Sequence, residues 1–100
     1  MSIRHIVMWK LGAQDPAEKL KQAEEMRDVL EALQGVVPTL RSITVRPNAL
    51  FVGANCDVVL DTTFDDAEGL AAYAAHPAHL AAGEVVKKYS VERSAVDYEF

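Results

Sequence analysis

The sequence predicts an α+β protein whose elements follow the order β-α-β-β-α-β. Four segments carry the apolar residues typical of strands, and two longer segments have helical periodicity with clear start signals. We therefore expect one four-stranded antiparallel sheet with the helices on one of its faces. With 100 residues, half of them apolar, the chain suits one compact domain that spans residues 1–100.

The first strand is predicted at residues 3–11, IRHIVMWKL. Its alternation places His5, Val7 and Trp9 on one face, while apolar residues also occur on the other face. The run SAVDYEF alternates apolar with acidic residues and predicts the last strand. Strands that are apolar on both faces need cover on both sides of the sheet.

The first helix is predicted within residues 14–35. Asp15 is suited to the N-cap and Pro16 to the first helical position, and Gly35 predicts the end of the segment. Apolar residues starting at Leu20 recur at helical spacing, so we expect this side of the helix to pack against the sheet.

Two further strands are predicted at residues 40–46 and 56–64. Their connection, residues 47–55, is longer than a tight hairpin and has an apolar centre, Leu-Phe-Val, at 50–52. An exposed apolar loop predicts a partner that covers it. The alternative is a loop that folds back on its own core.

The segment that contains YAAHPAH predicts two helices joined at a bend. Asp65 is suited to cap the first helix and Pro77 to open the second, and Pro77 disfavours helical geometry at His76. His76 is therefore the predicted hinge. Counted as one helical region, these helices complete the ferredoxin-like split βαβ order. Such a sheet leaves one face open, so we expect two chains to pack sheet to sheet as a homodimer.

Tyr73, His76 and His79 lie three residues apart and are candidates for a reactive site. His79 falls in the first turn of the predicted second helix, where the positive end of the helix dipole disfavours the imidazolium. A neutral His79 suits a general base, and the Tyr73 hydroxyl could polarise a substrate oxygen. The alternative is a structural joint in which both side chains pack with satisfied hydrogen bonds.

His5 interrupts an otherwise apolar strand. If its face of the sheet points at the helices, His5 could meet Tyr73 and His79 in one cavity. The alternative is a buried neutral histidine bonded to a backbone carbonyl or a carboxylate. His76 and His79 without a third ligand nearby in sequence are weak metal ligands, so we expect neither a metal nor another cofactor.

The composition argues against several classes of partner. Fifteen acidic and ten basic residues give a net charge of −5, and the basic residues form no stripe, which argues against nucleic acids and anionic membranes. Cys56 is the single cysteine, and no apolar stretch has the length of a signal peptide or a membrane span. A cytoplasmic protein without disulfides is the expectation.

Several segments together resemble one known family. IRHIVMWKL, VVPTLRSITV, DVVLDTTFDDAEGLAAYAAHPAHLA and VDYEF are similar to the stress-responsive α/β-barrel (Dabb) domain, within the dimeric α/β-barrel superfamily. The Y-x-x-H-P-x-H segment is the most specific part of this match. The resemblance implies a ferredoxin-like homodimer whose two sheets close a β-barrel.

The resemblance also implies candidate roles for residues. One branch of the family, the plant olivetolic acid cyclases, closes linear polyketides by aldol condensation without a metal or organic cofactor. A match to its motif makes Tyr73 the polarising hydroxyl, His79 the base and His5 a pocket histidine. Where that branch has polar and aromatic pocket residues, this chain has Leu30 and Val58, which implies a different substrate.

Three functional hypotheses follow. The first is a cofactor-independent, cyclase- or lyase-like catalyst that acts on a small ketone or polyketide-like acid through His79, Tyr73 and His5. The second is a non-catalytic or stress-associated dimer that binds a small apolar or phenolic ligand. The third is a cofactor-independent monooxygenase, which the superfamily fold permits.

Overall fold

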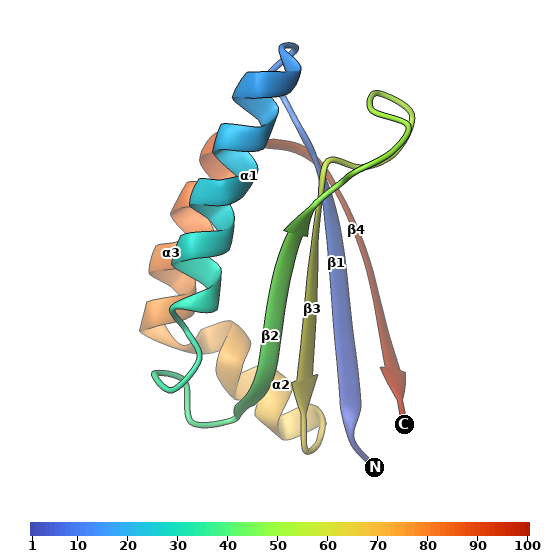
Figure 1. The fold of residues 1–100 in the computed structure, drawn as a ribbon. Helices are drawn as coiled ribbons and strands as arrows, with labels where there is room; N and C mark the ends of the chain where they lie inside the picture. The colour runs from blue at the N-terminus through green and yellow to red at the C-terminus, as the bar shows by residue number, and fades with distance from the viewer.

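The computed structural model describes residues 1–100 and contains one sheet with three helices on the same side of it (Figure 1). The elements are β1 (Ile3–Leu11), α1 (Pro16–Glu31), β2 (Leu40–Pro47), β3 (Val58–Phe64), α2 (Ala67–Ala75), α3 (Pro77–Tyr89) and β4 (Ser90–Glu99). The strand order is β2-β3-β1-β4, and every neighbouring pair is antiparallel. The predicted ferredoxin-like α+β fold is confirmed, with the second helical region split in two.

The core lies between the sheet and the helices because one side of each inner strand is apolar. Val7 on β1 pairs with Leu60 on β3, which in turn pairs with Val45 on β2, and all three side chains are buried. From the helices, Met26 of α1 and Tyr73 of α2 pack into the same core. This packing fixes the face of β1 that carries His5 and Trp9 toward the helices.

The start of α1 is confirmed in detail, whereas its predicted apolar face is partly wrong. The Asp15 carboxylate accepts a hydrogen bond from the Glu18 backbone N–H at 3.1 Å, as an N-cap should. Leu20, however, is 48% exposed. In its place Lys19 points toward the sheet, because its ammonium is 3.2 Å from a carboxylate oxygen of the buried Asp57.

The cap of α2 differs from the prediction by one residue. Asp66, and not Asp65, accepts the hydrogen bond from the Gly69 backbone N–H at 2.8 Å. Asp65 instead forms an ion pair with Arg41 of β2. A tertiary contact therefore selects between two adjacent aspartates that are equally suited to the cap.

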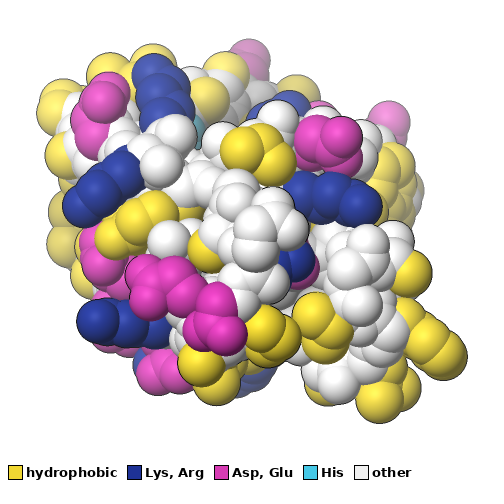
Figure 2. Space-filling model, turned by 90° about the horizontal axis from the view of Figure 1, so that it is seen from above, with side chains coloured by type: hydrophobic (Ala, Val, Ile, Leu, Met, Phe, Trp, Pro, Cys, Tyr) yellow, Lys and Arg dark blue, Asp and Glu magenta, His cyan; other side chains and the backbone are white.

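The loop between β2 and β3 is exposed, so the alternative in which it folds back on the core is wrong. Leu50, Phe51 and Val52 are 67%, 75% and 58% exposed. Phe51 adopts a left-handed backbone conformation, with φ of 52°, and its carbonyl accepts hydrogen bonds from two following backbone N–H groups. Figure 2 shows hydrophobic side chains at the projecting edge of the molecule, with acidic and basic side chains interspersed over the rest of that end. The predicted cover by a partner stays a prediction.

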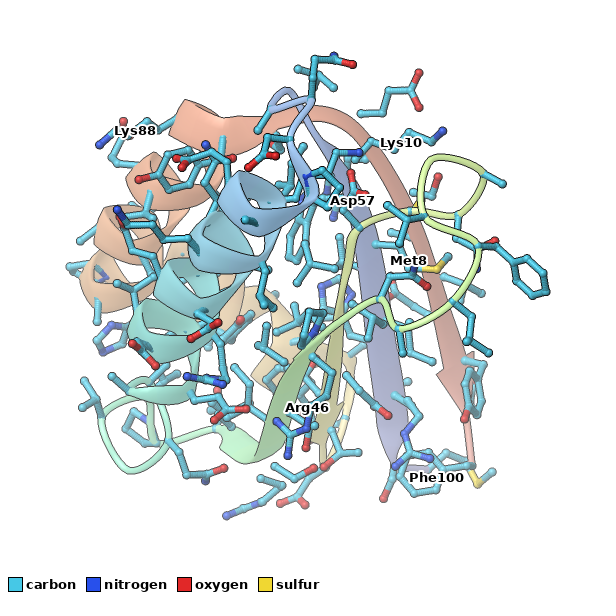
Figure 3. All side chains as sticks on the ribbon, turned by 45° about the horizontal axis from the view of Figure 1, so that its top comes forward. Met8, Lys10, Arg46, Asp57, Lys88 and Phe100 are labelled. Atoms are coloured by element: carbon cyan, nitrogen blue, oxygen red, sulfur yellow. The ribbon has the colours of Figure 1, made fainter.

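The sheet face that points away from the helices is the open face of the molecule. It carries apolar side chains of β1, β3 and β4 around the ion pair between Arg4 and Asp61. Figure 3 shows Met8 on this side of β1, and the adjacent strand contributes Val96 and Tyr98, which are 52% and 42% exposed. No residue of β4 is buried, so this edge strand is held chiefly by its ladder with β1.

Candidate active site

The three predicted site residues come together at one cavity of about 230 Å³ between the sheet and the helices. His5 comes from β1, Tyr73 from α2 and His79 from α3. The remaining lining residues are Val7, Trp9, Leu30, Leu60, Gly83, Val86, Lys87, Ser90 and Arg93. The cavity is therefore mainly apolar, with a few polar groups, which is the usual composition of a small-molecule site.

Tyr73 lines the cavity and is only 1% exposed. Its ring packs against Phe64 at 5.1 Å and against the His79 ring at 4.4 Å between centroids. The Tyr73 hydroxyl has no hydrogen-bond partner, and burial raises the pKa of Tyr73 to about 12. A buried hydroxyl without a partner is costly, so an oxygen atom of a bound molecule would find an unused donor here.

His79 is placed and oriented by the bend between α2 and α3. Its Nδ1 atom lies 3.1 Å from the Ala74 carbonyl oxygen. Because a carbonyl can only accept, Nδ1 must donate, which leaves Nε2 as the basic nitrogen of the neutral ring. Burial is the main cause that lowers the pKa of His79, and the nearby His5 lowers it further, although the bond to Ala74 acts the other way. Burial beside Tyr73 therefore favours the expected neutral state of His79.

His5 is oriented by a residue that the sequence analysis did not select. In the β1–β4 ladder His5 lies directly opposite Asp97, and the Asp97 carboxylate contacts Nδ1 of the imidazole. A carboxylate accepts hydrogen bonds, so Nδ1 carries a hydrogen, and in the neutral form of the ring Nε2 is the acceptor. In the sequence Asp97 is one of two acidic residues that alternate with apolar residues in the last strand, and only the strand register places it beside His5.

His76 is the structural hinge that the proline predicted. Its backbone has φ of −66° and ψ of 135°, which ends α2, and its Nδ1 accepts a hydrogen bond from the Ala78 backbone N–H at 3.0 Å. The side chain therefore caps α3, as a polar side chain at this position can. His76 does not line the cavity, so it is separate from the pair formed by Tyr73 and His79.

Sequence reasoning missed the groups at the other end of the cavity. Trp9, Lys87, Ser90 and Arg93 all line it. Trp9 was placed on the correct face, but the other three lie where α3 meets β4, a junction whose geometry is not encoded in any local motif.

No group of three or more histidine, cysteine or acidic side chains is placed to hold a metal ion.

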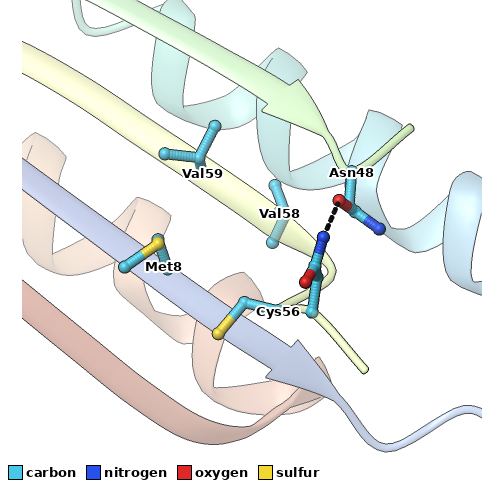
Figure 4. A pocket seen from close by; sticks show the side chains of 6 residues that line it. Met8, Asn48, Cys56, Val58 and Val59 are labelled. Atoms are coloured by element: carbon cyan, nitrogen blue, oxygen red, sulfur yellow. Dashed lines mark hydrogen bonds between the residues drawn. The ribbon is translucent and has the colours of Figure 1, made fainter. Parts of the chain in front are cut away.

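A second pocket of about 250 Å³ lies on the open face of the sheet (Figure 4). It is lined by Met8, Asn48, Asn55, Cys56, Val58 and Val59. An Asn55 side-chain N–H donates to the Asn48 side-chain oxygen at 3.3 Å across one end. None of the predicted site residues reaches this pocket. Val58, compared above with a pocket residue of the cyclase branch, lies here, whereas Leu30 lines the helix-side cavity.

Comparison with known families assigns the chain. A family model described as the stress-responsive A/B barrel domain (Dabb) matches residues 3–100. The chain belongs to the Dabb family. No protein of curated function matches the sequence significantly.

Solved structures of similar fold agree with the Dabb assignment. A dimeric protein of unknown function with a ferredoxin-like fold from Bacteroides fragilis is 33% identical, with a TM-score of 0.88 over 99% of this chain and 96% of that chain. A dimeric ferredoxin-like protein of unknown function from Thermobifida fusca is 26% identical, with a TM-score of 0.83 over 100% and 92%. A hydroxynitrile lyase from Passiflora edulis is 15% identical and shares the fold, with a TM-score of 0.79 over 97% of this chain and 91% of that chain.

None of the helices has the length and apolar character that a membrane crossing requires.

Proposed function

We propose that this Dabb protein is a cofactor-independent, cyclase- or lyase-like catalyst that removes a carbon-bound proton from a small ketone or polyketide-like acid. The observation that carries the proposal is the meeting of His5, Tyr73 and His79 at one apolar cavity, where the buried Tyr73 hydroxyl has no partner. A reactive carbonyl oxygen that accepts from Tyr73 would supply that partner. A neutral His79 beside it has the protonation state that a general base requires.

The proposed steps use only side chains of the cavity. Nε2 of His79 takes a proton from the carbon next to the substrate carbonyl, and the electron pair of that C–H bond moves into the enolate. The Tyr73 O–H donates to the enolate oxygen and stabilises its charge in an environment of low polarity. The enolate carbon can then attack a second carbonyl of the same substrate. The protonated His79 returns the proton to the new alkoxide, so the enzyme is unchanged.

His5 has a positioning part in this scheme. Its Nδ1–H is held by Asp97, so Nε2 of the neutral ring can accept a hydrogen bond from a substrate hydroxyl.

We also propose that the protein acts as a homodimer through the open face of the sheet. The apolar side chains on that face and the two similar structures described as dimeric support this assembly.

The test is proton exchange in heavy water. With 7-oxooctanoate as the probe, NMR measures the loss of the protons next to the ketone. We expect His79→Ala to lower the exchange rate by about 100-fold or more, since a positioned base contributes about that much. Tyr73→Phe keeps the ring that packs against Phe64 and removes only the hydroxyl, and we expect a loss of about 100-fold.

His76→Asn is the matched control, because asparagine retains a capping side chain and the residue lies outside the cavity. Circular dichroism and gel filtration check that all variants fold and assemble alike. Exchange that persists at the wild-type rate in His79→Ala contradicts the proposed base. A wild-type protein that binds the probe without exchanging its protons would instead support the second candidate, a non-catalytic binding dimer, which the apolar lining with Leu30 favours.

A further inference from the structure

The helix-side cavity has two chemically different ends. Along the β1–β4 ladder, His5 lies opposite Asp97 and Trp9 lies opposite Arg93. Four residues of a strand span roughly 13 Å, so the two pairs are set well apart. One end therefore holds His5, Tyr73 and His79, whereas Arg93 marks the other end.

The second end is cationic. Lys87 comes from the last turn of α3 and Arg93 from β4, and Ser90 lies between them where the helix meets the strand. The lining of the cavity includes no aspartate or glutamate. Two basic side chains thus face a cavity without acidic side chains in its lining, in a chain whose net charge is −5.

These two cations are available to a ligand. Arg93 takes part in none of the ion pairs of the structure. Lys87 makes only a contact of 3.8 Å with Glu84, in which both side chains are more than 70% exposed. Such solvent-exposed pairs are weak, so the Lys87 ammonium can exchange this contact for a better acceptor.

The stretch between the two ends is apolar. Val7, which lies between His5 and Trp9 on β1, and Leu30, Leu60 and Val86 supply the apolar part of the lining, with Trp9 opposite Arg93 at the cationic end. A volume of about 230 Å³ is below the range of roughly 300–1,000 Å³ that is usual for drug-sized ligands. The shape and chemistry therefore favour a small molecule with an anionic end, an apolar middle and a reactive carbonyl.

We infer that Arg93 and Lys87 bind the carboxylate of the substrate and so make the protein specific for oxo acids over neutral ketones. The Arg93 guanidinium can hold a carboxylate through two parallel N–H bonds, and the Lys87 ammonium and Ser90 hydroxyl can add one donor each. The carboxylate fixes one end of the chain, which places the distant carbonyl beside Tyr73. That the other end of the substrate carries a reactive carbonyl is taken from the function proposed above, so the inference rests on it.

The experiment compares an acid with its neutral analogue of the same size. The probes are 7-oxooctanoate and 7-oxooctanamide, which differ only in the terminal group. Trp9 is the single tryptophan and lines the cavity, so its fluorescence reports the Kd of each probe. Proton exchange by NMR, measured on the same samples, reports kcat and KM separately.

The wild-type protein should bind the acid at least about tenfold more tightly than the amide, since hydrogen bonds to charged groups contribute this much. In Arg93→Gln the acid should lose most of its advantage over the amide, with Lys87 retaining the remainder, and the Kd of the amide should not change. Arg93→Lys keeps the charge without the paired donors, so we expect an intermediate Kd. Lys87→Gln should weaken acid binding by a smaller factor than Arg93→Gln.

Lys88→Gln is the control for net charge. Lys88 is exposed, stacks over the Tyr89 ring at 5.2 Å and does not line the cavity, so the preference for the acid should stay as in the wild type. Equal affinity of the wild-type protein for acid and amide overturns the inference. So does an acid preference that is as large in Arg93→Gln as in the wild type.

The two proposals fail in different ways. If the acid preference depends on Arg93 but no protons exchange, the proposed catalysis is wrong and the carboxylate site stands. If His79-dependent exchange is equally fast with acid and amide, with the same KM, the carboxylate site is wrong and the proposed catalysis stands.

Discussion

Tyr73 and His79 show how burial can prepare two side chains for proton transfer. The two rings pack at a tilt with their centroids 4.4 Å apart, and burial raises the pKa of Tyr73 to about 12 while it lowers the pKa of His79. Both shifts favour the neutral form, so the tyrosine is a donor and the histidine is a base over the same pH range. Charge then develops in this pair only when a substrate proton moves.

The two pKa shifts predict the pH profile of proton exchange. The pKa of His79 lies below its usual value of 6.5, so activity should fall only as the pH drops below that value. Burial raises the pKa of Tyr73 to about 12, so its ionisation should produce no decline in rate across the neutral and mildly alkaline range. Initial rates of exchange between about pH 4.5 and about pH 9.5, a range that includes the usual pKa of histidine, test this predicted profile. A rate that keeps rising above pH 7 would contradict the His79 assignment.

The same shift links His79 to stability. Between the lowered pKa in the folded protein and 6.5 in the unfolded chain, the unfolded state binds more protons. The free energy of unfolding should therefore decrease as the pH falls below about 6.5, and His79→Ala should lose this part of the pH dependence.

At the scale of single residues, residue type was enough to select His5, Tyr73 and His79 as candidates for the site. It could not identify Asp97, because its role depends on a strand register set by residues far away in the chain.

At the scale of elements, local signals predicted the helices well where nothing competed with them. Asp15 caps α1 as expected, since no other acid precedes Pro16 closely. Asp65 and Asp66 are equivalent by local chemistry, and the ion pair between Asp65 and Arg41 of a distant strand decides which one caps α2. The start of β4 at Ser90 was also missed, because SVERS lacks the apolar alternation that marks a strand.

Asp57 lies directly before β3, and its side chain connects this strand to β1 and α1. We predict that its removal strongly lowers the stability of the protein. Its carboxylate accepts from the Leu11 backbone N–H at 2.8 Å and lies 3.2 Å from the Lys19 ammonium, and the residue is 8% exposed. Asp57→Ala leaves a buried donor and a cation without partners, so the free energy of unfolding should drop by about 2–4 kcal/mol. Urea denaturation measures it.

The control for this change is an aspartate with an exposed partner. Asp28 pairs with Arg27, and its side chain is 71% exposed, so Asp28→Ala should change stability by less than about 1 kcal/mol. Equal effects of the two substitutions would show that Asp57 does not connect the elements as described.

At the scale of the whole molecule, the open face of the sheet implies a second layer. Ile6 lies opposite Val96 in the ladder, and both belong to the face without helices. An antiparallel sheet can leave one face in water when that face is polar, but this one carries several large apolar side chains. The sequence predicted a second layer from the same pattern, strands that are apolar on both sides, and for this chain that layer stays a prediction.

Val96→Glu should weaken the proposed homodimer. The two-fold axis of a sheet-to-sheet dimer brings two new carboxylates into one interface, so we expect the dimer dissociation constant to rise by about 100-fold or more. Analytical ultracentrifugation over a range of concentrations measures it. Val36→Glu is the control, because Val36 lies on the helix side and is 54% exposed, close to the 52% of Val96. This change should leave assembly unchanged. If only Val36→Glu dissociates the protein, the interface lies on the helices.

The contact between His5 and Asp97 joins residues 92 positions apart, and this has a consequence for how the chain is made. The ribosome produces β1 first, and the edge of β1 that receives β4 has no partner until residues 90–99 have emerged. An unpaired strand edge can bind the edge of another chain. The nascent protein thus keeps one edge of β1 open until its candidate site forms, and a chain interrupted before β4 would carry that exposed edge permanently.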